Sequence, residues 1–175
     1  MNLLKEYKNV IIYLLRFVIL YVVFIKFYDY YLSYFKGGID PFTRLTAYSV
    51  REIYRIFHLS SEVIPTENEG IKLLVNGKYV ARIVEGCNAI SIVILFMVFL
   101  LAFWRFSRPV LGFMAMGILS IFILNVLRID LLGYILYAYP AYQDFWHKVV
   151  FPGIIYSWIV LLWVLFIKKY FGSNE

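Results

Sequence analysis

The sequence predicts an all-α polytopic membrane protein with about four transmembrane helices, and two observations support this fold class. Of the 175 residues, 63% are hydrophobic and only 16% are charged, whereas a soluble domain is close to half apolar and a quarter charged. Several apolar runs also approach the roughly 20 residues that a helix needs to cross the hydrocarbon core. This composition argues against a disordered chain, a disulfide-rich secreted domain and an ordinary soluble enzyme.

We expect residues 1–175 to form a single integral membrane domain. The predicted spans cover about residues 10–27, 89–104, 110–127 and 149–167. A cleaved signal peptide is an alternative interpretation of the first span, because lysines precede it. We favour a retained span, since no small-residue cleavage site follows this apolar run.

Basic residues flank the predicted spans on one side of the membrane. They are Lys5, Lys8, Arg105, Arg108, Lys168 and Lys169. The positive-inside rule therefore predicts a protein of the cytoplasmic (inner) membrane with both termini in the cytoplasm. The same flanking pattern accounts for the net charge of +6, so we expect the lipid bilayer, and no nucleic acid, as a partner. The segments 28–88 and 128–148 are then extracytoplasmic.

The first extracytoplasmic segment is predicted to begin with an amphipathic helix. Asp40-Pro41 is a typical helix start, with an N-cap followed by proline at the first helical position. Apolar residues then recur on one face and basic or aromatic residues on another: Leu45, Val50, Ile53, Ile56 and Phe57 against Arg44, Tyr48, Arg51 and Arg55. We favour packing of the apolar face against the protein over a dedicated lipid-binding role.

A short β-hairpin is predicted within residues 71–84. Asn76-Gly77 separates two β-prone runs, and a type I′ turn needs positive φ at both central residues. The polar stretch 60–70, with Pro65 and three glutamates, is expected to be a loop. Residues 129–139 stay ambiguous, because this apolar stretch can extend the third span or lie in the membrane interface.

Three predicted spans each present one chemically capable residue at the outer face. Cys87 precedes the second span, Arg128 follows the third, and His147 precedes the fourth. A thiolate is a nucleophile favoured at a helix N-terminus, a histidine can take and return its proton, and arginine donors can stabilise an oxyanion. This combination predicts acyl transfer on a peptide bond. Taken singly, each residue can also be structural. The cysteine can fill space in the packing, the arginine can anchor a span end at the membrane interface, and the histidine can belong to an aromatic belt at the headgroup level.

We predict neither a cofactor nor a metal. One cysteine and two histidines are too few for a Cys/His zinc site. One cysteine also allows no internal disulfide.

Around these residues the sequence resembles the exosortase/archaeosortase family of integral-membrane cysteine transpeptidases. The resemblance covers about residues 84–153 and rests on Glu85-Gly86-Cys87-Asn88-Ala89-Ile90, Asn125-Val126-Leu127-Arg128-Ile129 and His147. It implies that Cys87 is the nucleophile, Arg128 the transition-state stabiliser and His147 the acid/base. Glu85, Asn88 and Asn125 are then supporting residues. Many family members carry glycine at the position of Ala89, and the short chain resembles a compact Bacteroidetes-type exosortase.

The resemblance implies a sorting protease or transpeptidase. Its partners would be the C-terminal sorting-signal tails of exported, membrane-anchored proteins. The enzyme would cleave the tail on the outer face of the membrane, form a thioester on Cys87, and pass the acyl group to an amine or to water. A non-enzymatic membrane scaffold or assembly subunit is the alternative. A small transporter is disfavoured, because no ionisable residue is convincingly placed at the membrane midplane.

Overall fold

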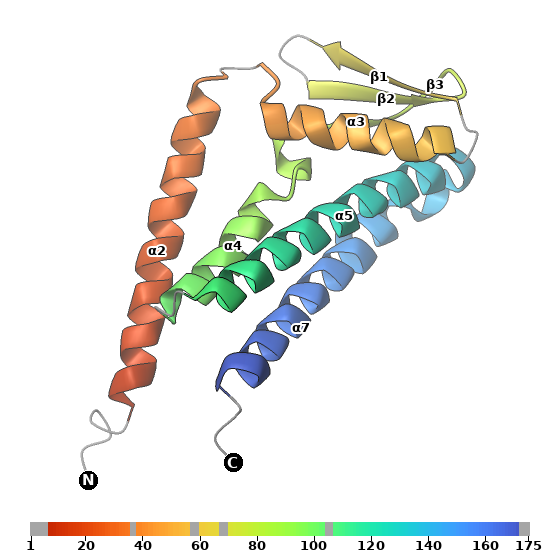
Figure 1. The fold of residues 1–175 in the computed structure, drawn as a ribbon. Coiled ribbons are helices and arrows are strands. Elements are labelled where there is room, and N and C mark those ends of the chain that lie inside the picture. Colours follow the sequence, from red (N-terminus) through yellow and green to blue (C-terminus); the bar gives the residue numbers. More distant parts are fainter. Residues whose placement is uncertain (1–6, 36–37, 57–59, 67–69, 104–106, 172–175) are drawn as a thin grey trace.

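The structure, a computed structural model, describes residues 7–35, 38–56, 60–66, 70–103 and 107–171. Helices dominate, and one small antiparallel sheet covers one end of the helical bundle (Figure 1). The helices are α2 (Lys8–Ser33), α3 (Pro41–Ile56), α4 (Ile90–Ala102), α5 (Arg108–Ala138), α6 (Gln143–Phe145) and α7 (Phe151–Phe171). The strands are β1 (Ser61–Thr66), β2 (Gly70–Val75) and β3 (Lys78–Ile83). Two 3-10 turns, η1 (Glu85–Cys87) and η2 (Pro140–Tyr142), and a π-helical turn, η3 (Trp146–Val150), complete the fold.

Three helices are long and apolar enough to cross a membrane. They are Lys8–Ser33, Arg108–Ala138 and the continuous helical stretch Trp146–Phe171. The helix in the second predicted span, α4, has only 13 residues, fewer than the roughly 20 that a span needs. The helical membrane fold is therefore as predicted, but the count of about four spans is not confirmed.

The third predicted span is longer than expected, because α5 does not end at residue 127. It continues without a break to Ala138, so residues 129–138 extend this helix by roughly 15 Å. The added turns are covered by other elements. The Tyr54 hydroxyl donates to the backbone oxygen of Asp130 at 2.7 Å, and the side chains of Tyr54 and Leu73 lie over Gly133. Burial raises the pKa of Tyr54, so this hydroxyl stays protonated and keeps donating.

The amphipathic helix starts as predicted. Asp40 Oδ1 accepts from the backbone N–H groups of Phe42 and Thr43 at 2.9 and 3.1 Å. The helix, α3, lies across the sheet-bearing end of the bundle (Figure 1). Its buried residues are Thr43, Thr46, Ala47, Val50 and Tyr54. The predicted single apolar face is wrong in one respect: Leu45 and Ile56 are 53% and 72% exposed.

The hairpin forms as predicted, with φ of 50° at Asn76 and 75° at Gly77. The segment expected to be a loop is partly a strand. Residues 61–66 form β1, which pairs antiparallel with β2 from Ser61↔Val75 to Thr66↔Gly70. Pro65 fits there because β1 is an edge strand of the order β1-β2-β3, where a missing N–H is tolerated.

Two clusters of buried residues hold the fold together. One joins α4, α5 and α7 through Phe96, Leu100, Ile121, Ile159 and Phe166. The other joins α3, the sheet and α5, and includes Ala47, Val50, Ile71, Leu73 and Val126. The helix α2 packs on α4 through aromatic contacts, such as that between Tyr13 and Phe103, 4.4 Å between ring centroids.

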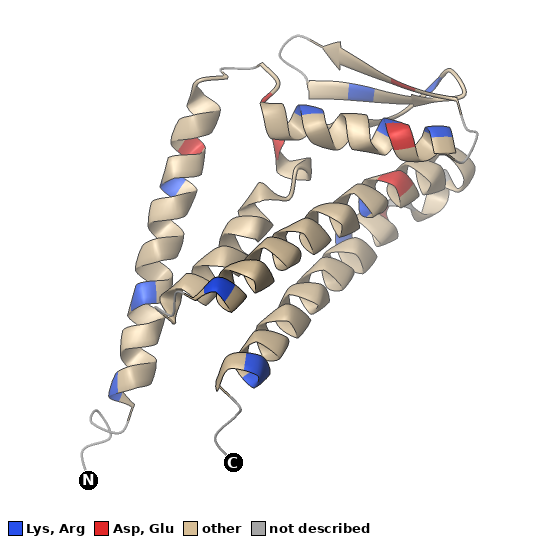
Figure 2. Ribbon diagram, in the orientation of Figure 1, with Lys and Arg blue, Asp and Glu red and all other residues tan. Residues whose placement is uncertain are grey.

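Charged residues are scarce along α4, α5 and α7 and gather at the ends of these helices and on the sheet side, whereas α2 carries charged residues at several levels along its length (Figure 2). Residues 109–127 and 149–167 carry no Lys, Arg, Asp or Glu. The side away from the sheet holds the start of α2, the end of α4, the start of α5 and the end of α7 (Figure 1). This arrangement is the one that the flanking charges require, although Lys5 and Arg105 themselves lie outside the described residues. Which side faces the cytoplasm stays a prediction.

Candidate active site

Cys87 ends the single 3-10 turn that links β3 to α4. Its backbone N–H donates to Val84 O at 2.7 Å, and its partly buried side chain packs against the cluster shared by α3, the sheet and α5. The helix begins only at Ile90, so Cys87 lies three residues before it and outside its first turn. The chain changes direction between them at Ala89, whose φ is 60°.

Asn88 fixes this turn to two other helices. Its side-chain Nδ2 donates to the Tyr28 hydroxyl at 2.8 Å and lies 3.3 Å from Thr43 Oγ1. Its Oδ1 accepts from the backbone N–H of Ile90 at 3.0 Å, which caps the start of α4. Asn88 is 3% exposed, so its amide holds the cysteine turn from inside the protein. Tyr28 and Thr43 were not predicted as site residues, because nothing in their local sequence marks either.

Asn125 connects the cysteine turn to α5. Its Nδ2 donates to the backbone oxygen of Cys87 at 2.7 Å, and its side chain is fully buried. Its Oδ1 is buried and has no hydrogen-bond partner within the part of the chain that the structure describes. Asn125, expected only as a supporting residue, thus makes a direct contact with the cysteine turn, 38 residues away in the chain.

Arg128 lies three residues after Asn125, and residues three apart are neighbours on a helix surface. It lines a cavity of about 100 Å³ between α5 and α7, together with Leu124, Leu127, Leu131, Phe151, Ile154 and Ile155. Its Nε is buried and makes no hydrogen bond to any described residue. A buried donor without a partner is costly. An anion or a developing oxyanion that accepts a hydrogen bond from this N–H group removes that cost. Glu85, at the start of the cysteine turn, is partly exposed.

His147 lies on η3, the π-helical turn that leads into α7. Its side chain is exposed, and among the described residues no hydrogen bond joins it to Cys87 or Arg128. The neighbouring Lys148 pairs with Asp144 at 3.0 Å. The structure therefore brings Cys87, Asn88 and Asn125 into direct contact and places Arg128 on the adjacent helix surface, whereas no hydrogen bond joins His147 to this group within the described residues. Single π-helical turns occur often at functional sites, which is a signal the sequence does not carry.

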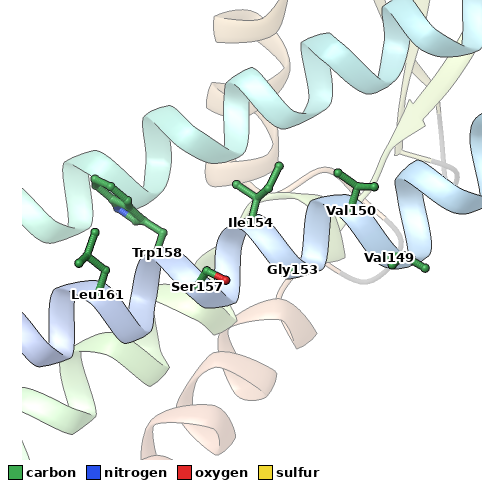
Figure 3. Close-up of a pocket in the computed structure, with 7 residues that line it drawn as sticks. All are labelled: Val149, Val150, Gly153, Ile154, Ser157, Trp158 and Leu161. Carbon is green, nitrogen blue, oxygen red and sulfur yellow. The ribbon is translucent and has the colours of Figure 1, made fainter.

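An apolar groove follows His147 along α7. Its volume is about 490 Å³ and its lining residues are Val149, Val150, Gly153, Ile154, Ser157, Trp158 and Leu161, all on η3 and α7 (Figure 3). Trp158 Nε1 donates to Ser120 Oγ of α5 at 3.0 Å. Ile154 lines both this groove and the Arg128 cavity. The residues that line the groove carry no ionisable side chain.

The described residues contain no group of three His, Cys, Asp or Glu side chains that could hold a metal ion. The polar groups at this end of the bundle include a thiol, a guanidinium, carboxamides, an imidazole, and the carboxylates of Glu85 and Asp130. These groups suit nucleophilic and acid–base steps on a carbonyl substrate.

The fold and the site together define a helical integral membrane protein whose single cysteine is held at the sheet-bearing end of the bundle. A family model described as transmembrane exosortase (Exosortase_EpsH) matches residues 7–166, and the chain belongs to this family. The resemblance seen around the cysteine motif is thus confirmed, and it extends over almost the whole chain. No curated protein and no solved structure matches the chain.

Proposed function

We propose that the protein is a cysteine transpeptidase that cleaves the C-terminal sorting signals of exported proteins at the outer face of the cytoplasmic membrane. The observation that carries this proposal is the hydrogen bond from Asn125 to the backbone of Cys87. In a member of the exosortase family, this bond holds the chain's only thiol beside the helix that bears Arg128. Acyl transfer needs this pairing of a nucleophile with nearby donors for an oxyanion.

The proposed reaction has two acyl-transfer steps. The Cys87 thiolate attacks the carbonyl carbon of the scissile peptide bond, and the tetrahedral intermediate expels the C-terminal part of the tail as an amine, which takes up a proton. The remaining acyl group is a thioester on Cys87. An acceptor amine, or water, then attacks the thioester and releases the thiol. Arg128 donates hydrogen bonds to the oxyanion of each intermediate, through donors such as the buried Nε that makes no bond within the described residues.

His147 is proposed to accept the thiol proton and to return it to the leaving amine. Its side chain is exposed and makes no hydrogen bond to Cys87 within the described residues, so the proposal requires this bond to form when a substrate binds. Catalytic hydrogen bonds often form fully only in the substrate complex. His147 lies on a π-helical turn, a feature that is frequent at functional sites.

The alternative function is a non-enzymatic scaffold or assembly subunit, and the lack of a hydrogen bond between His147 and Cys87 in the described part of the chain favours it. Thiol labelling distinguishes the two functions. An enzyme requires a thiol that reacts with a maleimide near neutral pH faster than a model cysteine peptide does, whereas a packing cysteine reacts more slowly.

The proposal is tested by trapping the thioester. A membrane-anchored reporter with a candidate sorting tail is expressed with the wild-type chain, and a thioester adduct on the Cys87 peptide is sought by mass spectrometry. Cys87→Ala should abolish both adduct and processing, and Cys87→Ser should be nearly inactive, because a serine hydroxyl is not ionised at neutral pH. Ser91→Ala, an equally small change at an exposed position of α4, should leave processing intact. Full processing by Cys87→Ala would exclude the covalent mechanism.

A further inference from the structure

The helix α3 exposes apolar side chains on a second side, away from its buried face. Phe42, Leu45 and Ile56 are 45%, 53% and 72% exposed. At 100° per residue these positions lie together with Ser49 on one side of the helix, about 120° from the buried face formed by residues such as Val50. The described parts of the chain leave these apolar side chains exposed. We therefore expect lipid or another molecule to cover them.

A cleft of about 390 Å³ lies between this helix and α5. Tyr48, Ser49, Glu52 and Ile53 of α3 form one wall, and Phe122, Ile123 and Val126 of α5 form the other. The first wall carries hydroxyl and carboxylate groups, whereas the second is entirely apolar. The cleft is therefore amphipathic and suits a ligand with a polar head and an apolar chain.

The apolar wall continues into the lipid-facing surface of α5. Ile123 is 49% exposed, and Met116, Leu119 and Leu127 on the same side of the helix are 68%, 51% and 47% exposed. The helix α5 is long and apolar enough to cross the membrane, and in a membrane this stripe contacts acyl chains. Because Ile123 belongs to both surfaces, lipid has direct access to the cleft.

Two arginines lie beside the polar wall, where the charged lining residue is Glu52. Arg51 Nη2 lies 2.7 Å from Glu52 Oε1, and Arg55 Nη1 lies 3.1 Å from Glu52 Oε2. The hydrogen bond from Arg51 and the nearby charge of Arg55 lower the pKa of Glu52, so the carboxylate stays ionised. Two guanidinium groups thus share one carboxylate, which leaves one net positive charge for a phosphate group.

We propose that this cleft binds one anionic phospholipid of the adjoining leaflet, with its phosphate beside Arg51 and Arg55 and an acyl chain along Phe122 and Ile123. The inference depends on the membrane location of the protein and not on its catalytic activity. A lipid bound here ties α3 to the level of the headgroups. Through the contact between Thr43 and Asn88, it also sets the level of the cysteine turn.

The test uses the full chain reconstituted in nanodiscs of phosphatidylcholine and phosphatidylglycerol, with native mass spectrometry to count phospholipids that stay bound after release. The wild-type protein should retain phosphatidylglycerol, and Ser49→Phe should lose it because the ring fills the cleft. Arg51→Gln should lower retention about fivefold, the factor expected for one arginine near a lipid surface. Arg44→Gln is the matched control: it makes the same charge change on an exposed residue of α3. Arg51 pairs with the cleft-lining Glu52, whereas no ion pair joins Arg44 to Glu52 among the described residues.

Equal retention by the wild type and Ser49→Phe overturns the proposal, and so does an equal loss in Arg44→Gln and Arg51→Gln, which would indicate general surface charge. A photo-reactive benzoylphenylalanine in place of Tyr48 gives a second readout that does not depend on the fold of Ser49→Phe. An adduct of phospholipid mass supports lipid in the cleft. A cross-linked dimer, or a cross-link to another protein, means that the cleft is an interface with that protein and overturns lipid binding.

Discussion

Ala89 adopts a φ of 60° at the step between the cysteine turn and α4. Its backbone oxygen accepts from the N–H groups of Ile92 and Val93 at 3.1 and 2.9 Å, so it also begins the helix. Only glycine adopts this left-handed conformation without steric cost. The glycine that many exosortases carry here therefore has a backbone reason, and this chain accepts some strain to use alanine.

Substitutions of Ala89 should separate the effect of backbone strain from that of side-chain size.

 Ala89→Gly relieves a cost of about 1–2 kcal/mol in the folded state but adds freedom to the unfolded chain, so we expect stability equal to the wild type or up to about 1 kcal/mol higher. Ala89→Val places a β-branched residue at positive φ in a buried position and should cost about 1–3 kcal/mol. Thermal unfolding in detergent measures both changes. A less stable Ala89→Gly would show that the left-handed backbone is not strained.

Arg128 and His147 should differ in what their loss does to processing. If Arg128 stabilises the oxyanion, Arg128→Ala lowers the rate by about 10²–10³, and Arg128→Lys restores it only in part because the planar fork is lost. His147→Ala should instead change the pH dependence, since a group that titrates near neutrality no longer moves the proton.

Alkylation of Cys87 gives a readout of these roles without a substrate. In His147→Ala the alkylation rate should fall near neutral pH and recover in alkaline buffer, whereas Arg128→Ala should change it less. Unchanged processing of a tailed substrate by both variants would mean that the two residues are structural.

At the scale of elements, the close packing of α4 on α5 depends on Gly117. A Cβ at this position would collide with the ring of Phe96, whereas a Cβ at Gly112 of the same helix meets nothing within 4 Å. Phe96 is fully buried in the cluster that joins α4, α5 and α7. The short helix α4 is therefore held by the shape of α5 as well as by its apolar composition.

Alanine at these two glycines should have opposite effects on stability. Gly117→Ala forces the helices apart and should cost about 1–3 kcal/mol, partly offset by the higher helix propensity of alanine. Gly112→Ala gains that propensity without a collision and should stabilise the protein by up to about 1 kcal/mol. The melting temperature of each variant in detergent tests the pair. Equal effects would contradict the tight approach of α4 to α5.

For the whole molecule, the separation of its two ends leads to a prediction of topology. The turn Asn76-Gly77 lies at the end of the sheet, whereas the junction of α4 and α5 lies on the opposite side (Figure 1). With the basic residues in the cytoplasm, a reporter active only outside the cytoplasm should be active when fused at Gly77 and inactive at Ser107. The reverse pattern would place the cysteine turn in the cytoplasm and exclude the proposed reaction there.

The sequence by itself determined the features that depend on neighbouring residues. Asp40 caps a helix and Asn76-Gly77 forms a hairpin because the required hydrogen bonds and φ angles involve residues close in the chain. The apolar helices follow from composition, because the transfer of a long apolar run out of water is favourable. The family also followed from the sequence, through the short motifs around Cys87 and Arg128.

Only the tertiary structure decided the features that depend on distant contacts. The strand β1 exists because β2 supplies its hydrogen bonds, although Pro65 and the acidic residues around it locally favour a loop. The outer turns of α5 are covered by Tyr54 and Leu73, which come from other elements. Likewise, Asn88 is held by a tyrosine 60 residues away. Each of these contacts joins segments whose local sequences do not specify one another, so their pairing arises only when the chain packs.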